Sequence, residues 1–235
     1  MGSSCRNRTA GSIALDCLIA AVSLFFNGLG IYLTIHASIG AGPWDVFNLG
    51  LSKTLGILYG NASITVCLII LAIDIVLKEP IGLAMFIDSL VVGKSVDLFT
   101  WLNIVPVPDS LPGRIAMMLL GLVIMGYTQY LYMWAGLGCG PRDTLLVGLA
   151  KHLRRVPIGA VSIVLLTLVT AIGYLLGGPV GIGTLICAFC AGPIMQLAFT
   201  TVHFNATTIR HQPLGESIGI LLGRTSSQKS MSGEF

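Results

Sequence analysis

Six long apolar segments, separated by charges and helix breakers, constrain the fold of this chain more than any other feature. They cover residues 12–35, 58–77, 81–103, 114–135, 157–176 and 180–203. About 20 helical residues are needed to cross the roughly 30 Å hydrocarbon core of a bilayer. Because 54% of the 235 residues are hydrophobic and only 10% are charged, the chain has too few charges for an ordinary water-facing surface. The sequence therefore predicts an all-α membrane protein with six transmembrane helices.

The positive charges between these segments indicate an orientation, because Lys and Arg are retained on the cytoplasmic side. With the N-terminus inside, Lys53 and Arg114 lie outside, and Lys94 lies within a segment. The inner side holds Arg6, Arg8, Lys78, Arg142, Lys151, Arg154, Arg155, Arg210, Arg224 and Lys229. The first segment is too long for the apolar region of a signal peptide. We expect a multi-pass protein with both termini in the cytoplasm.

The chain also contains an internal repeat. Residues 39–45 match residues 137–143 at an offset of 98, and both copies continue with Gly-Leu and a Lys. After a slip of one residue the offset is 99, so Ser63 matches Ser162 and Gly93 matches Gly192. Each half holds three apolar segments, and an odd number places the start of the second half on the opposite side of the membrane. The sequence thus predicts two inverted repeats, an architecture common among transporters.

The predicted organisation follows from this repeat. We expect a first three-helix repeat over 12–104 and a second over 114–204, each with a short extra helix after its first span. An external Pro-rich loop over 105–113 joins them, and cytoplasmic tails occupy 1–11 and 205–235.

The repeated Gly-x-Gly-Pro-x-Asp segments carry most of the candidate site residues. Two glycines permit a sharp turn, proline suits the first position of a helix, and aspartate in the first turn faces its positive end. The helices expected over 43–55 and 141–152 are too short to span a bilayer. They could lie on the membrane surfaces, or they could be re-entrant half-helices whose N-termini converge. The candidate residues are Gly42, Pro43, Trp44, Asp45, Gly140, Pro141, Arg142 and Asp143.

The two copies differ where Trp44 is replaced by Arg142. If both segments face one cavity, that cavity has an aromatic wall on its outer side and a cation on its inner side. Alternatively, Arg142 follows the positive-inside rule and pairs with Asp143.

Three charges, Asp88, Lys94 and Asp97, fall within the third apolar segment. Charges inside a membrane are costly and usually face an interior, water or a partner. The spacing of Lys94 and Asp97 suits an ion pair on one helix face, whereas Asp88 points elsewhere. Lys94 and Asp97 are either part of a polar pathway or proton-coupled site, or a neutralised structural pair between helices. Further polar candidates for interior faces are Asn27, Gln129, Tyr130 and Gln196.

Together, the Gly-x-Gly-Pro-Trp-Asp segment at 40–45 and the Gly-x-Gly-Pro-Arg-Asp segment at 138–143 resemble those of the YczE/YyaS/YitT family of bacterial membrane proteins. The resemblance covers residues 12–205 or so. It implies a bacterial inner-membrane protein of transporter-like character. Lys94 departs from the apolar or proline residue that the resemblance would place there.

These features favour a small permease or channel for a solute or ion. The alternative is a non-transporting membrane scaffold or accessory factor. We find no catalytic motif in the segments and expect no enzyme activity, no cofactor and no metal site. The pair Cys187 and Cys190 suits helix packing. The expected partners are the lipid bilayer, a small solute or ion, and further copies of the chain through its Gly-rich helices, with no nucleic acid.

Overall fold

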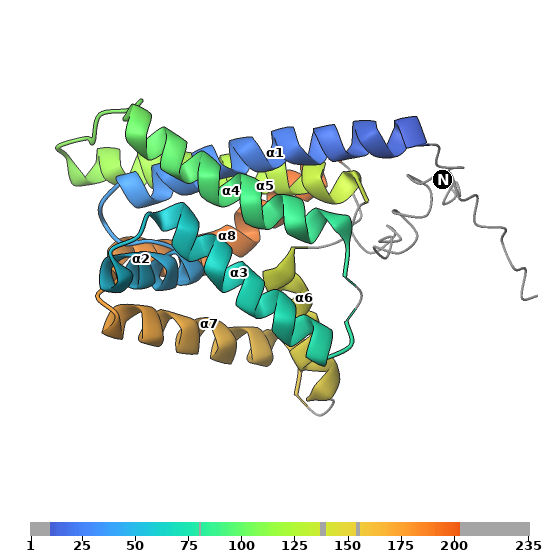
Figure 1. The fold of residues 1–235 in the computed structure, drawn as a ribbon. Helices are drawn as coiled ribbons and strands as arrows, with labels where there is room; N and C mark the ends of the chain where they lie inside the picture. Colours follow the sequence, from blue (N-terminus) through green and yellow to red (C-terminus); the bar gives the residue numbers. More distant parts are fainter. Residues whose placement is uncertain (1–9, 80, 137–139, 154–155, 203–235) are drawn as a thin grey trace, which may run out of the picture.

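The structure, a computed structural model, describes residues 10–79, 81–136, 140–153 and 156–202. These residues form eight α-helices and no strand (Figure 1). The predicted tails, 1–11 and 205–235, lie outside the described residues except for residues 10 and 11. Residues 137–139 of the second repeat segment also lie outside them. The helices are α1 (Ala10–His36), α2 (Pro43–Leu55), α3 (Tyr59–Val76), α4 (Leu83–Leu102), α5 (Leu111–Trp134), α6 (Pro141–His152), α7 (Ile158–Leu175) and α8 (Ile182–Thr201).

Five of these helices, α1, α3, α5, α7 and α8, are long and apolar enough to cross a membrane. They correspond to five of the six apolar segments in the sequence. α4, which corresponds to the sixth, is 20 residues long and carries Asp88, Lys94 and Asp97. In each half the order of the helices is the same, with a short second helix between long ones.

The two short helices begin and end at the predicted residues. Gly42 and Gly140 precede them with nearly identical backbone angles, φ −62° and ψ 157° against φ −66° and ψ 157°. A proline follows each glycine at the first helical position, where its missing N–H is not needed. Val46 and Asn48 of α2 are fully buried. One face of α2 is therefore covered by the rest of the protein, whereas its last residues, 53–55, are exposed.

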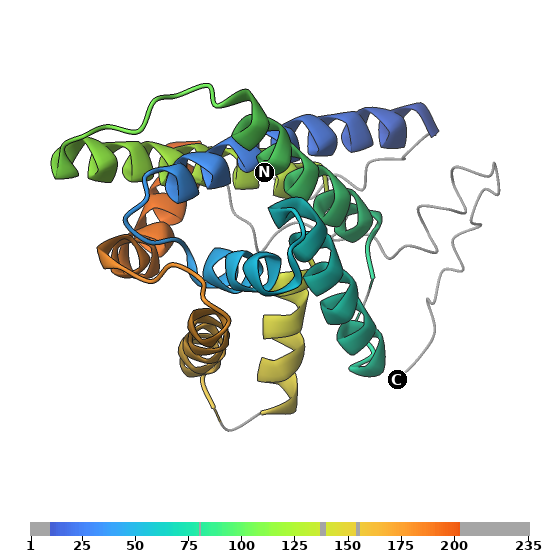
Figure 2. The ribbon, with the colours of Figure 1, turned by 60° about the vertical axis from the view of Figure 1, so that its left-hand side comes forward.

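The long helices of the two halves pack against each other in matching pairs. α1 and α5 lie side by side, with α4 against α1 and α8 against α5 (Figures 1 and 2). Each short helix packs on the middle long helix of the other half, α2 on α7 and α6 on α3. A Cβ at Gly50 of α2 would lie 2.9 Å from the Leu176 Cβ, and one at Gly148 of α6 would lie 3.2 Å from the Leu77 Cδ1. These glycines allow the close approach of helices from opposite halves.

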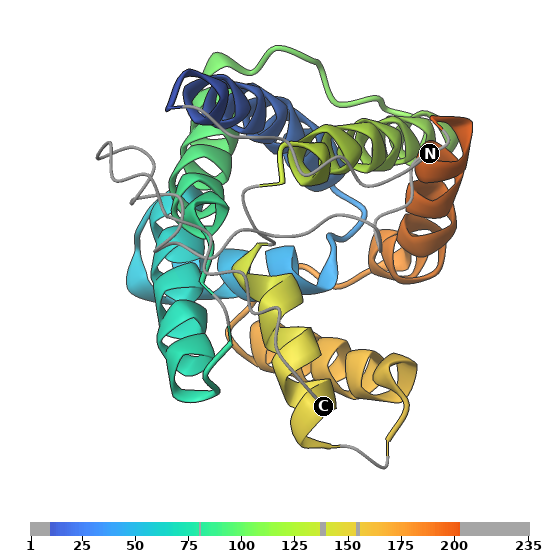
Figure 3. The same ribbon diagram turned by 90° about the vertical axis from the view of Figure 1, so that its right-hand side faces the viewer.

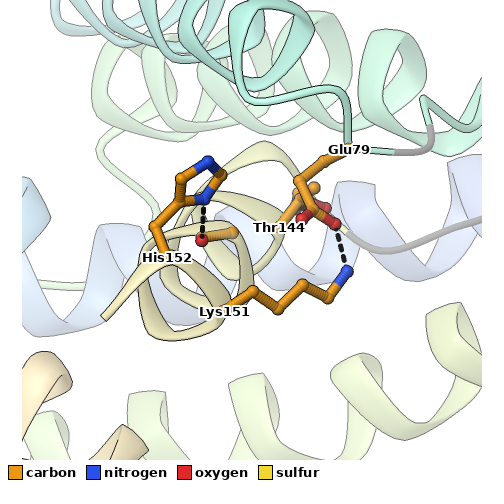
Figure 4. A network of polar contacts seen from close by, with 6 residues as sticks. Glu79, Thr144, Lys151 and His152 are labelled. Atoms are coloured by element: carbon orange, nitrogen blue, oxygen red, sulfur yellow. Dashed lines mark hydrogen bonds and ion pairs between the residues drawn. The ribbon is translucent and has the colours of Figure 1, made fainter. Parts of the chain in front are cut away.

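The end of α6 is also held by an ion pair to the segment that follows α3 (Figure 4). Lys151 Nζ lies 2.6 Å from Glu79 Oε2, and the Glu79 side chain is only 6% exposed. The neighbouring His152 ring nitrogen Nδ1 lies 3.0 Å from the Gly148 carbonyl oxygen within the same helix. The ion pair between Lys151 and Glu79 holds the end of α6 against the first half of the chain.

The two halves differ in the packing of their last two helices. α3 packs against α4, whereas α7 and α8 diverge after the turn that joins them (Figure 3).

Candidate functional site

A cavity of about 560 Å³ lies among α1, α2, α3, α4, α5, α6 and α8. Its wall includes the polar or charged residues Asn27, Ser63, Asp88, Gln129, Arg142 and Asp143. The remaining wall is largely apolar, with Met125 and Phe199 among its members. A second cavity of similar volume, beside α1, α4 and α5, has an apolar lining that includes Phe25, Leu33 and Met117. Ligand sites combine apolar walls with a few placed polar groups, so the first cavity is the candidate.

Arg142 lies at the start of α6, and its side chain contacts the first half of the chain. One guanidinium nitrogen donates a hydrogen bond to the Ser63 hydroxyl at 3.2 Å. The guanidinium carbon lies 5.4 Å from the centre of the Trp44 ring, within the range of a cation–π interaction. Trp44 and Arg142, which hold equivalent positions in the two repeat segments, therefore contact each other.

The Arg142–Asp143 ion pair, one of the two interpretations of this segment, does not form. The Asp143 carboxylate instead accepts a long hydrogen bond of 3.5 Å from the Gln129 side chain. Arg142 and Asp143 are neighbours in one helical turn, so their side chains project in different directions.

Three carboxylates lie within electrostatic reach of Arg142. Asp88 and Asp143 line the cavity, and Asp143 is exposed. Asp45 lies behind the cavity wall, is 6% exposed, and accepts a hydrogen bond of 2.7 Å from the Tyr59 hydroxyl. Charges shielded from water interact more strongly than charges at a surface. The site thus combines one fixed cation with acidic groups in a partly enclosed space.

Gly140 has a second role in addition to its place in the turn before α6. A Cβ at this position would lie 3.2 Å from the Asp88 Oδ2, tighter than ordinary contact. The absent side chain allows the Asp88 carboxylate to approach the backbone at the start of α6. The N–H groups of a helix's first turn have no partner within the helix, and an acidic side chain is favourable beside them.

Lys94 and Asp97 lie outside the cavity, and the predicted ion pair between them is wrong. The Asp97 carboxylate accepts a hydrogen bond of 2.8 Å from the Gly60 N–H at the start of α3. The Lys94 ammonium donates one of 2.7 Å to the Asn61 side-chain oxygen. Each charge thus binds the start of α3, where the Gly60 N–H has no partner within the helix. The second carboxylate oxygen, Asp97 Oδ2, is buried without a hydrogen-bond partner among the described residues. These contacts favour the structural interpretation of the pair.

Sequence reasoning identified a large part of the polar wall. Trp44, Asp88, Gly140, Arg142 and Asp143 line the cavity, as do Asn27 and Gln129 from the wider set of polar candidates. Gly42, Pro43 and Pro141 form the starts of the short helices, and Pro141 is buried. Tyr130 and Gln196 are not among the cavity residues.

Other contributors were not predicted, among them Ser63, Cys67 and Tyr132 on the cavity wall and Tyr59 behind it. The match of Ser63 to Ser162 was the one signal that pointed to any of them.

Several apolar helices around a charged cavity define a multi-pass membrane protein. The chain belongs to the family described as a family of unknown function, DUF6198, which matches residues 14–200. No solved structure matches this chain.

Three relatives extend over most of the chain. A Haemophilus influenzae protein described as uncharacterized is 29% identical over 188 residues, covering 80% of this chain and 84% of the relative. The uncharacterized membrane protein YczE of Bacillus subtilis is 30% identical, covering 77% and 86%. The uncharacterized protein YyaS of the same bacterium is 30% identical, covering 78% and 92%. The predicted resemblance to YczE and YyaS is confirmed.

Proposed function

We propose that this protein carries a small, positively charged solute across a bacterial inner membrane through the cavity that contains Arg142. The observation that carries the proposal is the placement of Arg142, Asp88 and Asp143 on the wall of one cavity in a membrane protein. Burying charge within a membrane is costly, and such charges commonly mark a substrate or ion pathway. The volume of about 560 Å³ is within the range of small-molecule sites.

The balance of charge favours a cation as the solute. Two carboxylates, Asp88 and Asp143, line the cavity against the single guanidinium of Arg142, and Asp45 adds a third carboxylate nearby. When these groups are ionised, the site carries excess negative charge that a bound cation would neutralise. The apolar wall, with Met125 and Phe199, suits an organic cation with a hydrocarbon part.

The proposal places the cavity between two inverted repeats of three spans, with α4 as the sixth span. Three observations support this arrangement: the repeat at an offset of 98, the equal order of helices in each half, and the exchange by which α2 packs on α7 and α6 packs on α3. Transporters of this architecture bind solutes at the interface of the repeats. Cytoplasmic termini follow from the excess of Lys and Arg between the segments. The reaction involves no chemical step and no cofactor.

Uptake into proteoliposomes tests the proposal. The purified protein is reconstituted and supplied with radiolabelled tetramethylammonium, ethanolamine, K⁺, acetate or phosphate. We expect at least one cation, and neither anion, to enter faster than into protein-free vesicles. Asp88→Asn and Asp143→Asn should each lower that uptake by about tenfold, the effect of losing roughly 1.4 kcal/mol of interaction.

Asp109→Asn is the matched control, because Asp109 lies exposed in the loop before α5. Folded protein that moves none of these solutes would favour the non-transporting scaffold. Uptake of acetate or phosphate alone would overturn the proposed charge selectivity.

A further inference from the structure

α3 and α4 touch backbone to backbone through two glycines. A Cβ at Gly60 would collide with the Gly93 carbonyl oxygen, and one at Gly93 would lie 2.9 Å from the Gly60 carbonyl oxygen. No side chain fits between the helices at this point. This contact brings α3 and α4 together near the start of α3.

The equivalent glycines of the second half do not touch. At the repeat offset of 99, Gly60 corresponds to Gly159 and Gly93 corresponds to Gly192. A Cβ at either Gly159 or Gly192 would meet no atom within 4 Å. The same two positions are thus closed in one half and open in the other, in agreement with the divergence of α7 and α8 (Figure 3).

The two repeated aspartates differ in their exposure, and the covered one is again in the first half. Asp45 is covered by Tyr59, the first residue of α3, and is 6% exposed. Its counterpart Asp143 is exposed on the cavity wall, and the residue equivalent to Tyr59 at the start of α7 is Ile158. In the first half, where α3 packs against α4, the aspartate is covered. In the second half, where α7 diverges from α8, the aspartate is exposed.

We propose that this is one of two states of an alternating-access cycle, in which the α3–α4 contact is a closed gate and Gly159 and Gly192 form the equivalent gate in the second state. The inference rests on the proposed transport function. When α7 closes on α8, α3 and α4 separate, so that the cavity changes the side to which it opens. Under the predicted orientation the closed gate is external and the open gate is cytoplasmic, because α3 begins outside and α7 begins inside.

Asp97 and Lys94 act as a latch on the closed gate. Asp97 accepts the Gly60 N–H at 2.8 Å and Lys94 donates to Asn61 at 2.7 Å, both across the α3–α4 contact. Their counterparts in the second half are Gln196 and Pro193, and the counterpart of Asn61 is Ala160. None of these three can reproduce the charged latch. A contact present in one state and absent from the other shifts the equilibrium toward the state that contains it.

A reversible cross-link tests the second gate directly. In the closed first gate the Lys94 and Asn61 side chains bridge α3 and α4 at 2.7 Å, and their counterparts are Pro193 and Ala160. Ala160→Cys and Pro193→Cys are therefore combined in a chain whose native cysteines are replaced by alanine and which is first shown to fold. We expect a short bifunctional methanethiosulfonate to join the two cysteines and to stop uptake, and reduction to release the cross-link and restore uptake. A transporting protein in which this pair never cross-links would overturn the inference.

The pair Val164→Cys and Leu185→Cys is the matched control on the same two helices. Their counterparts Thr65 and Phe86 are exposed on α3 and α4, so this pair is not expected to meet in either state. Cross-linking of the control pair at an equal rate would also count against the proposed gate, because it would indicate unspecific motion of α7 and α8.

Labelling of Cys67 provides a second readout that does not need the cross-linked pair. Cys67 lines the cavity from α3, and it is kept as the single cysteine of the chain. A membrane-impermeant maleimide is added to the outside of spheroplasts. Asp97→Ala should raise the rate of labelling by about tenfold, because it removes a charge-assisted hydrogen bond from the closed gate. Asp109→Ala should leave it unchanged.

An unchanged rate in Asp97→Ala would overturn the latch and the gate. The two proposals fail separately. If the cross-link forms and the labelling behaves as expected but no solute moves, the transport function fails and the two-state change stands. If solutes move while both gate measurements are negative, only the gate fails.

Discussion

The two halves of this protein share a sequence pattern and a helix order, yet they differ in what surrounds their equivalent residues. Gly60 is pressed against α4, whereas Gly159 meets nothing. Asp45 is sealed by Tyr59, whereas Asp143 faces the cavity. A repeat therefore fixes the local turns and helices but not the packing between them. In these two pairs of equivalent residues one member is packed and the other is not, so the same substitution in both halves measures the effect of the packing.

The largest expected difference between the halves concerns the paired glycines. Gly60→Leu should destabilise the protein by about 3 kcal/mol, because its side chain would meet the backbone of α4. Gly159→Leu, the same change at the equivalent residue, should leave stability nearly unchanged. Thermal unfolding of the detergent-solubilised variants measures both. Equal losses of stability would contradict the closed and open assignment of the two positions.

The aspartates give the second comparison. Asp45→Ala leaves the buried Tyr59 hydroxyl without its acceptor and should cost about 2 kcal/mol of stability. Asp45→Asn keeps an acceptor oxygen and should recover part of that loss. Asp143→Ala should change stability by less than about 0.5 kcal/mol, because this carboxylate is exposed and holds one long hydrogen bond. Chemical denaturation compares the three variants. A stability loss from Asp143→Ala as large as that from Asp45→Ala would contradict the assignment of Asp45 as covered and Asp143 as exposed.

What could be predicted from the sequence is mostly local. The bounds of α2 and α6 follow from glycine, proline and aspartate within a few residues of each helix start, and the structure confirms them. Five of the predicted spans have the length and apolarity that a membrane requires. The sixth predicted span, α4, carries three charges in 20 residues, so composition alone does not classify it.

What could not be predicted depends on contacts between distant segments. Lys94 and Asp97 have the spacing of an ion pair, but each binds the start of α3, which is more than 30 residues away in the chain. Nothing in the sequence of α4 indicates that the Gly60 N–H and the Asn61 side-chain oxygen of α3 lie beside Asp97 and Lys94. Likewise, the contact of Arg142 with Trp44 joins two halves of the chain, and the divergence of α7 from α8 has no sequence signal.

The contact between the two repeat segments can be measured as a coupling. Arg142→Lys keeps the charge but loses the planar group that lies over Trp44 and should cost about 1 kcal/mol of stability. In the Trp44→Leu background the same change should cost clearly less. A double-mutant cycle on unfolding free energies isolates the interaction of the two side chains. A coupling energy of zero would mean that the exchange of Trp for Arg between the repeats has no joint role in packing.

The smallest expected effect concerns the two lysines near the ends of the short helices. Lys151 pairs with Glu79, whereas its counterpart Lys53 forms no ion pair with any residue that the structure describes. Because Lys151 is 58% exposed, solvent weakens the pair, and Lys151→Ala should cost about 0.5 kcal/mol. Lys53→Ala should cost less. Raising the salt concentration should reduce the Lys151 effect, since screening acts on the exposed charge. Unfolding at low and high salt measures the pair, and a loss that does not depend on salt would assign the effect to the apolar stem of Lys151 instead of its charge.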